Sequence, residues 1–318
     1  MTAMADEQTR LMTKVARLYH THGMRQTDIA SRLQISQSRV SRLLTQAEES
    51  GIVRTVVAVP PHIFGDLEDA VEQRYPVREV HVIDVVSQDS AELTRDLAHA
   101  MGTLLGDVTF DAPTIGFTSW SQTLRVLVDD LAPLRTKTTH VVEMLGDLGP
   151  PSLQHDAAYS TRQLATLADA QAVFLRTPGV VASAEMRELM VSRDVYAQQA
   201  LAMLDHIDLA LVGIGAAEVD PALTAGDNFF THEQFKQMRD RGAVGEVCLH
   251  FLDADGNAID GELDELVIGV TREQLKSARR RWAVAGGERK HAAIRAALAG
   301  GYVDTLVTDT VTAEYLVS

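Results

Sequence analysis

The chain has 318 residues, one cysteine and a net charge of −15, and 46% of its residues are hydrophobic, 23% charged and 5% aromatic. This is the composition of an ordinary globular protein, so it excludes disordered, collagen-like and disulfide-stapled classes, and the length predicts roughly two domains. Because no apolar run approaches the ~18 residues of a membrane span and the N-terminus lacks the apolar core of a signal peptide, we expect a cytoplasmic protein with no membrane partner.

The charge is distributed unevenly along the chain. Residues 1–60 carry eight basic and five acidic side chains, a net charge of +3. The remaining residues carry 21 basic and 39 acidic side chains, a net charge of −18. A small basic module attached to a large acidic body is typical of a DNA-binding protein that has a second function.

Three helices and a strand are expected in the basic module. Apolar residues at helical spacing predict a first helix over residues 9–21, Thr27 is expected to cap a short second helix, and Ser36 is expected to cap a third. The β-branched run of residues 52–59 predicts a strand. Two helices joined by a short turn and followed by a β element are typical of a winged helix-turn-helix, which we assign to residues 1–58.

The outward face of the third helix carries side chains that can bind DNA. Arginine can donate two hydrogen bonds to guanine, glutamine pairs with adenine, and serine bonds bases or phosphates. The acidic side chains of this helix come only at its far end. A helical interaction domain is the alternative. The residues predicted to bind operator double-stranded DNA are Thr27, Gln37, Ser38, Arg39, Ser41 and Arg42.

A pair of prolines separates the basic module from the acidic body. Pro60 and Pro61 can neither continue a strand ladder nor enter a helix interior, so residues 59–63 are expected to form a linker. Over residues 64–318, strand-like apolar runs alternate with amphipathic helical segments. The alternation predicts an α/β domain with a doubly wound, mostly parallel sheet, whose ligands bind at the carboxyl ends of the strands.

Four of these strand ends carry groups suited to a polar ligand. Residues 116–123 combine a glycine, hydroxyls and the free amides of a helix start, which can hold an anion such as phosphate, although an ordinary capped turn is the alternative. The Gly-x-Gly of residues 213–215 lets the backbone come close to a ligand. Glu246 begins an apolar strand expected over residues 244–251. Lys290 lies one turn into a helix, where it opposes the helix dipole unless an anion is present.

The N-terminal segment resembles that of the SorC family of bacterial transcriptional regulators, in residues 26–33, 35–44 and 49–53. The strand ends extend the resemblance over nearly the whole chain. The motifs that carry it are Gly116-x-Thr118-Ser119-Trp120, Gly213-Ile214-Gly215, Gly242-Ala243-Val244-Gly245-Glu246 followed by Asp255-Gly256, Val284-Ala285-Gly286-Gly287 with Lys290, and the ending from Ala296 to Ala313.

This resemblance has implications for the fold and for the ligand. It implies a NagB/RpiA-like fold, related to sugar-phosphate isomerases and glucosamine-phosphate deaminases, that binds a sugar or phosphorylated sugar as effector. It also implies that Thr118 and Ser119 help to hold phosphate and that Glu246 and Lys290 line the ligand pocket. No cofactor is expected besides the effector.

Two departures from the family pattern bear on the identity of the effector. The sequence Trp120-Ser121-Gln122-Thr123 stands where many relatives have Trp-Gly-Arg-Thr, so an arginine at the helix start is missing. Asp147 stands where relatives tend to have glycine, and its carboxylate repels phosphate but attracts hydroxyls, so a phosphorylated and an unphosphorylated effector both stay open. Arg162 is a further candidate contact. The predicted effector-binding residues are Gly116, Thr118, Ser119, Trp120, Asp147, His155, Asp156, Gly213, Gly215, Glu246 and Lys290.

Together these features predict a DNA-binding repressor of a carbohydrate or polyol catabolic operon, controlled by a sugar, polyol or sugar-phosphate effector. Because operator symmetry mirrors protein symmetry, we expect a homodimer or homotetramer. The alternative is a sugar-phosphate isomerase, deaminase or lactonase fused to a helical module, which needs a positioned acid–base pair. The sequence predicts no catalytic or metal-binding residues. Asp253–Asn257 partly matches a calcium loop but lacks its closing glutamate, so we interpret it as a hairpin turn.

Overall fold

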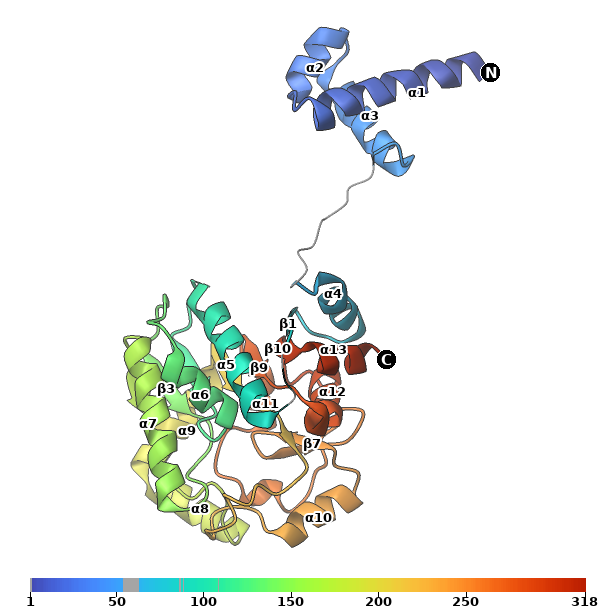
Figure 1. The fold of residues 1–318 in the computed structure, drawn as a ribbon. Coiled ribbons are helices and arrows are strands. Elements are labelled where there is room, and N and C mark those ends of the chain that lie inside the picture. Colours follow the sequence, from blue (N-terminus) through green and yellow to red (C-terminus); the bar gives the residue numbers. More distant parts are fainter. Residues whose placement is uncertain (1, 54–62, 86, 88, 108) are drawn as a thin grey trace. The chain divides into compact units, whose positions relative to one another are not determined.

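The computed structural model describes residues 2–53, 63–85, 87, 89–107 and 109–318 (Figure 1). The chain divides into two compact units, Met1–Val59 and Pro60–Ser318. Most of the predicted linker, and residues 54–59 of the predicted strand, lie outside the described residues. Ile52 and Val53 are described, and they form a bend rather than the start of a strand.

Three helices pack around a small apolar core in the N-terminal unit. They are α1 (Thr2–Ala16), which continues in a π-helical turn η1 (Arg17–Thr21), α2 (Gln26–Leu33) and α3 (Gln37–Glu49). Val15, Ile29 and Val40 are fully buried where the three helices meet. The helical spacing of apolar residues therefore predicted all three helices, although α1 begins earlier than residue 9.

The caps of α2 and α3 differ from each other. The Ser36 hydroxyl accepts a hydrogen bond from the Arg39 amide at 3.3 Å, so Ser36 caps α3 as predicted. The N-cap of α2 is Arg25, which has an extended backbone and makes no side-chain capping bond. The prediction that Thr27 caps α2 is therefore wrong, because the helix starts two residues earlier and Thr27 lies exposed in its first turn.

A seven-stranded sheet forms the centre of the second unit, and all of its neighbouring strands are parallel. The strand order is β1-β10-β9-β5-β2-β3-β4. In that order the strands are β1 (Glu79–Ile83), β10 (Thr305–Asp309), β9 (Arg281–Val284), β5 (Leu209–Val212), β2 (Thr114–Phe117), β3 (His140–Glu143) and β4 (Gln171–Val173).

Helices cover both faces of this sheet, with a separate apolar core on each side (Figure 1). One face packs against α5 (Ser90–Asp107), α6 (Gln122–Asp130) and α7 (Pro151–Leu167). The other face packs against α4 (Gly65–Arg74), α12 (His291–Ala299) and α13 (Thr310–Val317). The prediction of an α/β fold with a mostly parallel central sheet is confirmed.

The direction of the chain reverses between β2 and β5. From β2 the chain proceeds through β3 to β4 at one edge, and from β5 it proceeds through β9 and β10 toward the other. The ligands of open α/β sheets generally bind at the carboxyl ends of the strands beside such a switch point. The segments that follow β2 and β5 are therefore expected to contribute to a ligand-binding site.

A small antiparallel sheet lies beyond the carboxyl end of β5. It comprises β6 (Gly215–Ala216), β7 (Gly245–Val247) and β8 (His250–Leu252). The prediction of a single strand over residues 244–251 is therefore wrong. Cys248 and Leu249 turn the chain, with φ of +52° and +65°, and separate β7 from β8. The Asp253 side chain accepts hydrogen bonds from the Asp255 and Asn257 amides, so this segment forms the expected turn.

The remaining helices lie around the small sheet and at the periphery of the unit. They are α8 (Ala184–Arg193), α9 (Val195–Met203), α10 (His232–Asp240) and α11 (Arg272–Ser277), with 3₁₀ turns η2 (Leu204–His206), η3 (Asp264–Leu266) and η4 (Glu288–Lys290). In the part of the chain that the structure describes, no helix combines the length and apolar character required to cross a membrane.

Candidate functional site

The predicted DNA-binding side chains are all exposed in the N-terminal unit. Gln37, Ser38, Arg39, Ser41 and Arg42 occupy the first half of α3, on the face opposite its buried residues. No described carboxylate forms an ion pair with either of these two arginines. The α3 surface is therefore basic and free to bind an anionic partner.

In the second unit, the segment that follows β2 carries two buried polar groups that have no hydrogen-bond partner among the described residues. Thr118 and Ser119 are buried, and the Thr118 amide donates to the Leu211 carbonyl of β5 at 3.1 Å. Ser121 caps α6 by accepting from the Leu124 amide. The Ser119 hydroxyl and the Trp120 indole N–H are buried and make no hydrogen bond with any described residue. Buried polar groups are normally bonded, so these two have hydrogen-bonding capacity left for a ligand or water.

Two glycines allow the neighbouring segments to come close to this one. A Cβ on Gly213 would lie 2.8 Å from the Ser121 Cβ and Oγ, and a Cβ on Gly215 would lie 2.0 Å from a Glu246 carboxylate oxygen. Gly215 also faces Glu246 in the β6–β7 pairing. A larger residue would displace the α6 cap Ser121 at the first position and the predicted site residue Glu246 at the second, so both glycines are required for this close approach.

Glu246 is held beneath the tight turn between β7 and β8. Its carboxylate accepts from the Leu249 amide at 2.6 Å. Burial raises the pKa of Glu246, while the Leu249 hydrogen bond and the Lys290 charge oppose that rise. The Cys248 thiol in the same turn lies 3.6 Å from the Thr118 hydroxyl, and burial raises the pKa of this thiol to about 12. The turn therefore joins Glu246 to the β2 segment.

Lys290 lies near Glu246, in the segment that follows β9. It is the last residue of the 3₁₀ turn η4. The residue before this turn is Gly287, and its φ of +88° favours glycine. Burial lowers the pKa of Lys290, and the Glu246 carboxylate opposes this effect. Among the described residues no carboxylate forms an ion pair with the Lys290 ammonium. A largely desolvated cation without a close counter-ion is suited to bind an anionic or strongly polar ligand.

Gly116 is placed apart from this group. It lies inside β2, where an added Cβ would come within 2.7 Å of the Met144 sulfur. Its lack of a side chain therefore serves core packing between β2 and the residue after β3. The prediction that Gly116 contacts the effector receives no support from its position.

A second group of charged residues lies at the carboxyl end of β3. Asp147 forms an ion pair with Arg176 at 2.8 Å, and the guanidinium carbon of Arg176 lies 4.6 Å from the centroid of the Phe174 ring. Burial raises the pKa of Asp147, and the charge of Arg176 opposes this rise. Arg176 therefore compensates the charge of the Asp147 carboxylate.

Glu143, which the sequence analysis did not single out, lies beside this ion pair. It is 3% exposed, and it accepts from the Thr161 hydroxyl and the Leu175 amide at 3.0 Å each. Burial raises the pKa of Glu143 to about 7, against the opposing effect of Arg176. Its position as the single acidic residue at the end of the apolar run before Met144 was the available signal.

Glu143 is expected to make the stability of the second unit depend on pH. Its raised pKa means that the folded state retains the proton up to about pH 7, whereas the unfolded chain loses it near pH 4.5. The free energy of unfolding should therefore decrease by about 3 kcal/mol as the pH rises from 4.5 to 7. Chemical denaturation at pH 5 and pH 8 measures this decrease, and Glu143→Gln should reduce it. An unchanged pH dependence in the variant would show that Glu143 does not titrate in this range.

His155 and Asp156 are exposed on α7 and do not join either group. Asp156 lines a shallow pocket of about 280 Å³ between α6 and α7, together with Arg125 and Tyr159. The guanidinium of Arg162 lies 5.7 Å from the Phe174 ring centroid. The structure therefore does not place His155 or Asp156 with the residues around Glu246.

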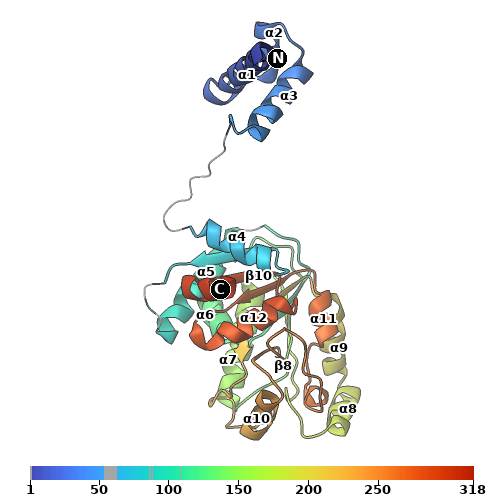
Figure 2. The same ribbon diagram turned by 90° about the vertical axis from the view of Figure 1, so that its right-hand side faces the viewer.

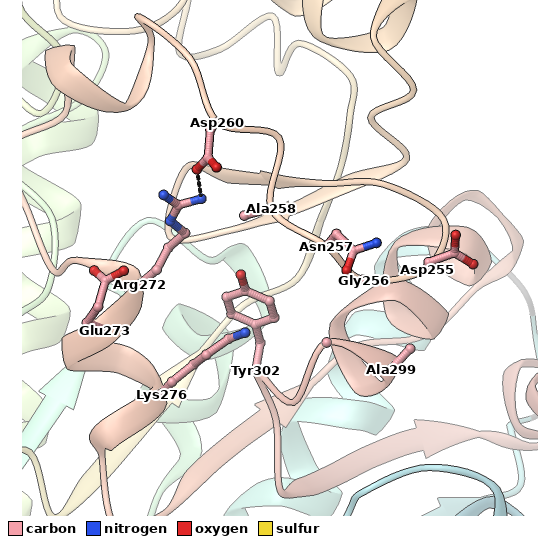
Figure 3. A pocket seen from close by; sticks show the side chains of 11 residues that line it. Asp255, Gly256, Asn257, Ala258, Asp260, Arg272, Glu273, Lys276, Ala299 and Tyr302 are labelled. Atoms are coloured by element: carbon pink, nitrogen blue, oxygen red, sulfur yellow. Dashed lines mark ion pairs between the residues drawn. The ribbon is translucent and has the colours of Figure 1, made fainter.

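A pocket of about 470 Å³ lies near the amino end of β10 (Figure 3). It is lined by the turn after β8, by α11 and by the segment before β10. Arg272 forms an ion pair with Asp260, and the Lys276 ammonium lies 4.2 Å from the Tyr302 ring centroid. Both cations are therefore already partnered, and none of the predicted effector-binding residues lines this pocket. We do not assign the effector to it.

The described residues contain no cluster of three or more His, Cys, Asp or Glu side chains that could hold a metal ion. The arrangement nearest the switch point is instead a set of hydroxyls, backbone amides, one carboxylate and one ammonium. Such a set can hold hydroxyl groups and an anion at the same time.

Comparison with known proteins is consistent with this arrangement. Residues 62–318 match the family model described as "Putative sugar-binding domain". The chain is 30% identical to the deoxyribonucleoside regulator of Bacillus subtilis over 315 residues, which are 99% of each chain. It is also 30% identical to the sorbitol operon regulator of Klebsiella pneumoniae, over 96% of this chain and 97% of that one.

A solved structure supports the likeness over both units. The full-length sorbitol operon regulator SorC of Klebsiella pneumoniae superposes with a TM-score of 0.65 at 25% identity, covering 98% of this chain and 100% of that one. These relatives are named as transcriptional regulators and not as enzymes. The comparisons therefore favour a regulator over the enzyme alternative.

Proposed function

The chain belongs to the SorC family of sugar-binding transcriptional regulators, and from this membership we propose that it is a cytoplasmic repressor of a carbohydrate or polyol operon. In this proposal the N-terminal unit is a winged helix-turn-helix that binds operator DNA through α3. The second unit has a NagB/RpiA-like fold, binds a sugar-type effector without a further cofactor, and forms a homodimer or homotetramer. Two of the relatives are named as a sorbitol operon regulator and a deoxyribonucleoside regulator, which supports a sugar-type effector.

One observation carries the effector assignment. The Thr118–Ser121 segment, Glu246 and Lys290 lie near one another at the switch point of the sheet, and no described residue bonds the Ser119 hydroxyl or the Trp120 indole N–H. The hydroxyls, the helix start and Lys290 suit a phosphate, while Glu246 suits sugar hydroxyls. The Arg176–Asp147 ion pair removes the electrostatic objection to a phosphorylated ligand.

The effector controls DNA binding only if it binds the DNA-bound and the free state with different affinities. The test is fluorescence anisotropy with a DNA fragment from upstream of the chain's own gene, titrated with sugars, polyols and their phosphates. The DNA affinity should fall steeply with salt, because binding of phosphates by basic side chains releases counter-ions. One class of compound should weaken DNA binding at least tenfold. Failure to bind the fragment at low salt, or no response to any compound, would contradict the proposal.

A further inference from the structure

An exposed apolar surface extends over α8 and the start of α9. Eight large hydrophobic side chains are exposed among the described residues, and four of them lie within eleven consecutive positions. These four, which we call the α8–α9 patch, are Met186, Leu189, Val195 and Tyr196, with exposed fractions of 42%, 57%, 55% and 76%. Figure 2 places α8 and α9 at the outer edge of the second unit. Such a concentration of exposed apolar side chains is typical of an interaction surface.

The packing of α8 explains why its outer face is free. None of its ten residues is fully buried. Met190 and Val191 contact the small core beneath α9, and Arg187 donates to the Val267 carbonyl at 2.7 Å. These residues are spaced three and four positions apart and therefore share the inner face of the helix, whereas Leu189, two positions from Arg187, is directed to the opposite face.

The charges on the outer face of α8 are arranged with opposite signs at its two ends. Glu185 and Glu188 lie in the N-terminal half and Arg193 is the last residue of the helix. All three are exposed, and no described residue forms an ion pair with any of them. Glu185, Leu189 and Arg193 are spaced four residues apart and therefore lie in one row along the helix.

We propose that the α8–α9 patch binds the same patch of a second copy of this chain about a two-fold axis that passes near Leu189. Two α8 helices paired antiparallel about that point bring Glu185 of each chain opposite Arg193 of the other. The two Leu189 side chains then meet at the axis, and the two helix dipoles are oppositely directed. A partner of a single charge sign would not match both ends of this face, whereas a second copy does.

This proposal names the surface for the oligomer in the proposed function, but it does not depend on DNA or effector. The mass of the full-length chain, measured by size-exclusion chromatography with light scattering, tests it in the absence of both. The wild-type chain should form a dimer or a larger even-numbered assembly. A monomer at all concentrations would overturn the proposal and leave the effector assignment untouched.

Leu189→Asp places two carboxylates at the two-fold axis and should raise the dimer dissociation constant by about 30-fold or more. Tyr159→Asp is the matched control, because Tyr159 is 54% exposed on α7, away from the patch. This variant should associate like the wild type. Equal effects of the two substitutions, or no effect of Leu189→Asp, would overturn the assignment of the surface.

A charge exchange tests the antiparallel register separately from folding. Glu185→Arg alone and Arg193→Glu alone each bring like charges together and should weaken association by about tenfold. The double variant Glu185→Arg/Arg193→Glu restores opposite charges across the axis and should associate nearly as well as the wild type. Additive weakening in the double variant would overturn the proposed pairing.

Discussion

Replacing Arg39 or Arg42 with alanine is expected to lower the affinity for operator DNA by about a hundredfold or more. Both side chains are exposed in the first half of α3 and lack a carboxylate partner among the described residues. A bidentate arginine contact with guanine contributes ~1–3 kcal/mol of discrimination, and a dimer loses two such contacts at once. Fluorescence anisotropy with specific and scrambled fragments measures the loss.

Arg10→Ala provides the control for this experiment. It removes the same charge from the same unit, but Arg10 lies exposed on α1, outside the predicted contact face. We expect it to weaken specific and nonspecific binding alike, by only about threefold, through the general phosphate attraction. Specific binding that survives both α3 substitutions, or that falls equally in Arg10→Ala, would show that α3 is not the recognition helix. Unchanged circular dichroism confirms that each variant is folded.

Replacing Lys290 with alanine is expected to weaken effector binding about a hundredfold and so to remove most of the thermal stabilisation of the full-length chain by its effector. A ligand present at 100 times its dissociation constant stabilises the folded state by about 2.7 kcal/mol, and a hundredfold weaker ligand at the same concentration stabilises it by only about 0.4 kcal/mol. Lys290 lacks a close counter-ion among the described residues and has Glu246 as its main electrostatic partner. Thermal-shift measurements with sugars, polyols and their phosphates detect the difference.

The neighbouring Arg289 offers a matched control. Arg289 is exposed and forms an ion pair with Glu218, so Arg289→Ala should retain the full ligand-induced shift. Glu246→Gln should weaken binding of hydroxyl-bearing ligands whether or not they are phosphorylated. If free sugars stabilise the chain while phosphorylated ones never do, the assignment of phosphate to Thr118 and Ser119 is wrong. If Arg289→Ala and Lys290→Ala behave alike, Lys290 does not bind the effector.

Local patterns in the sequence were sufficient to predict most helices and the class of fold. The apolar spacing of Val15, Ile29 and Val40 predicted three packed helices, because helical periodicity directly determines which face is buried. The alternation of apolar runs and amphipathic segments predicted a parallel sheet covered on both faces. The prediction of a single strand over residues 244–251 was wrong. Cys248 and Leu249 are residue types that rarely adopt positive φ, so their sequence gives no sign of the turn that the packing of the unit imposes there.

The sequence by itself determined the two-unit organisation, the exposed basic face of α3 and the polar residues at the ends of β2, β7 and β9. Only the tertiary structure decided which of them meet. Gly215 comes against Glu246, and Thr118 against Cys248, because strand order places segments about 30 and 130 residues apart at one edge. The tertiary structure also determines that Asp147 pairs with Arg176 and that Glu143 is buried. Long-range pairing and burial depend on the packing of the whole unit, which a local pattern does not encode.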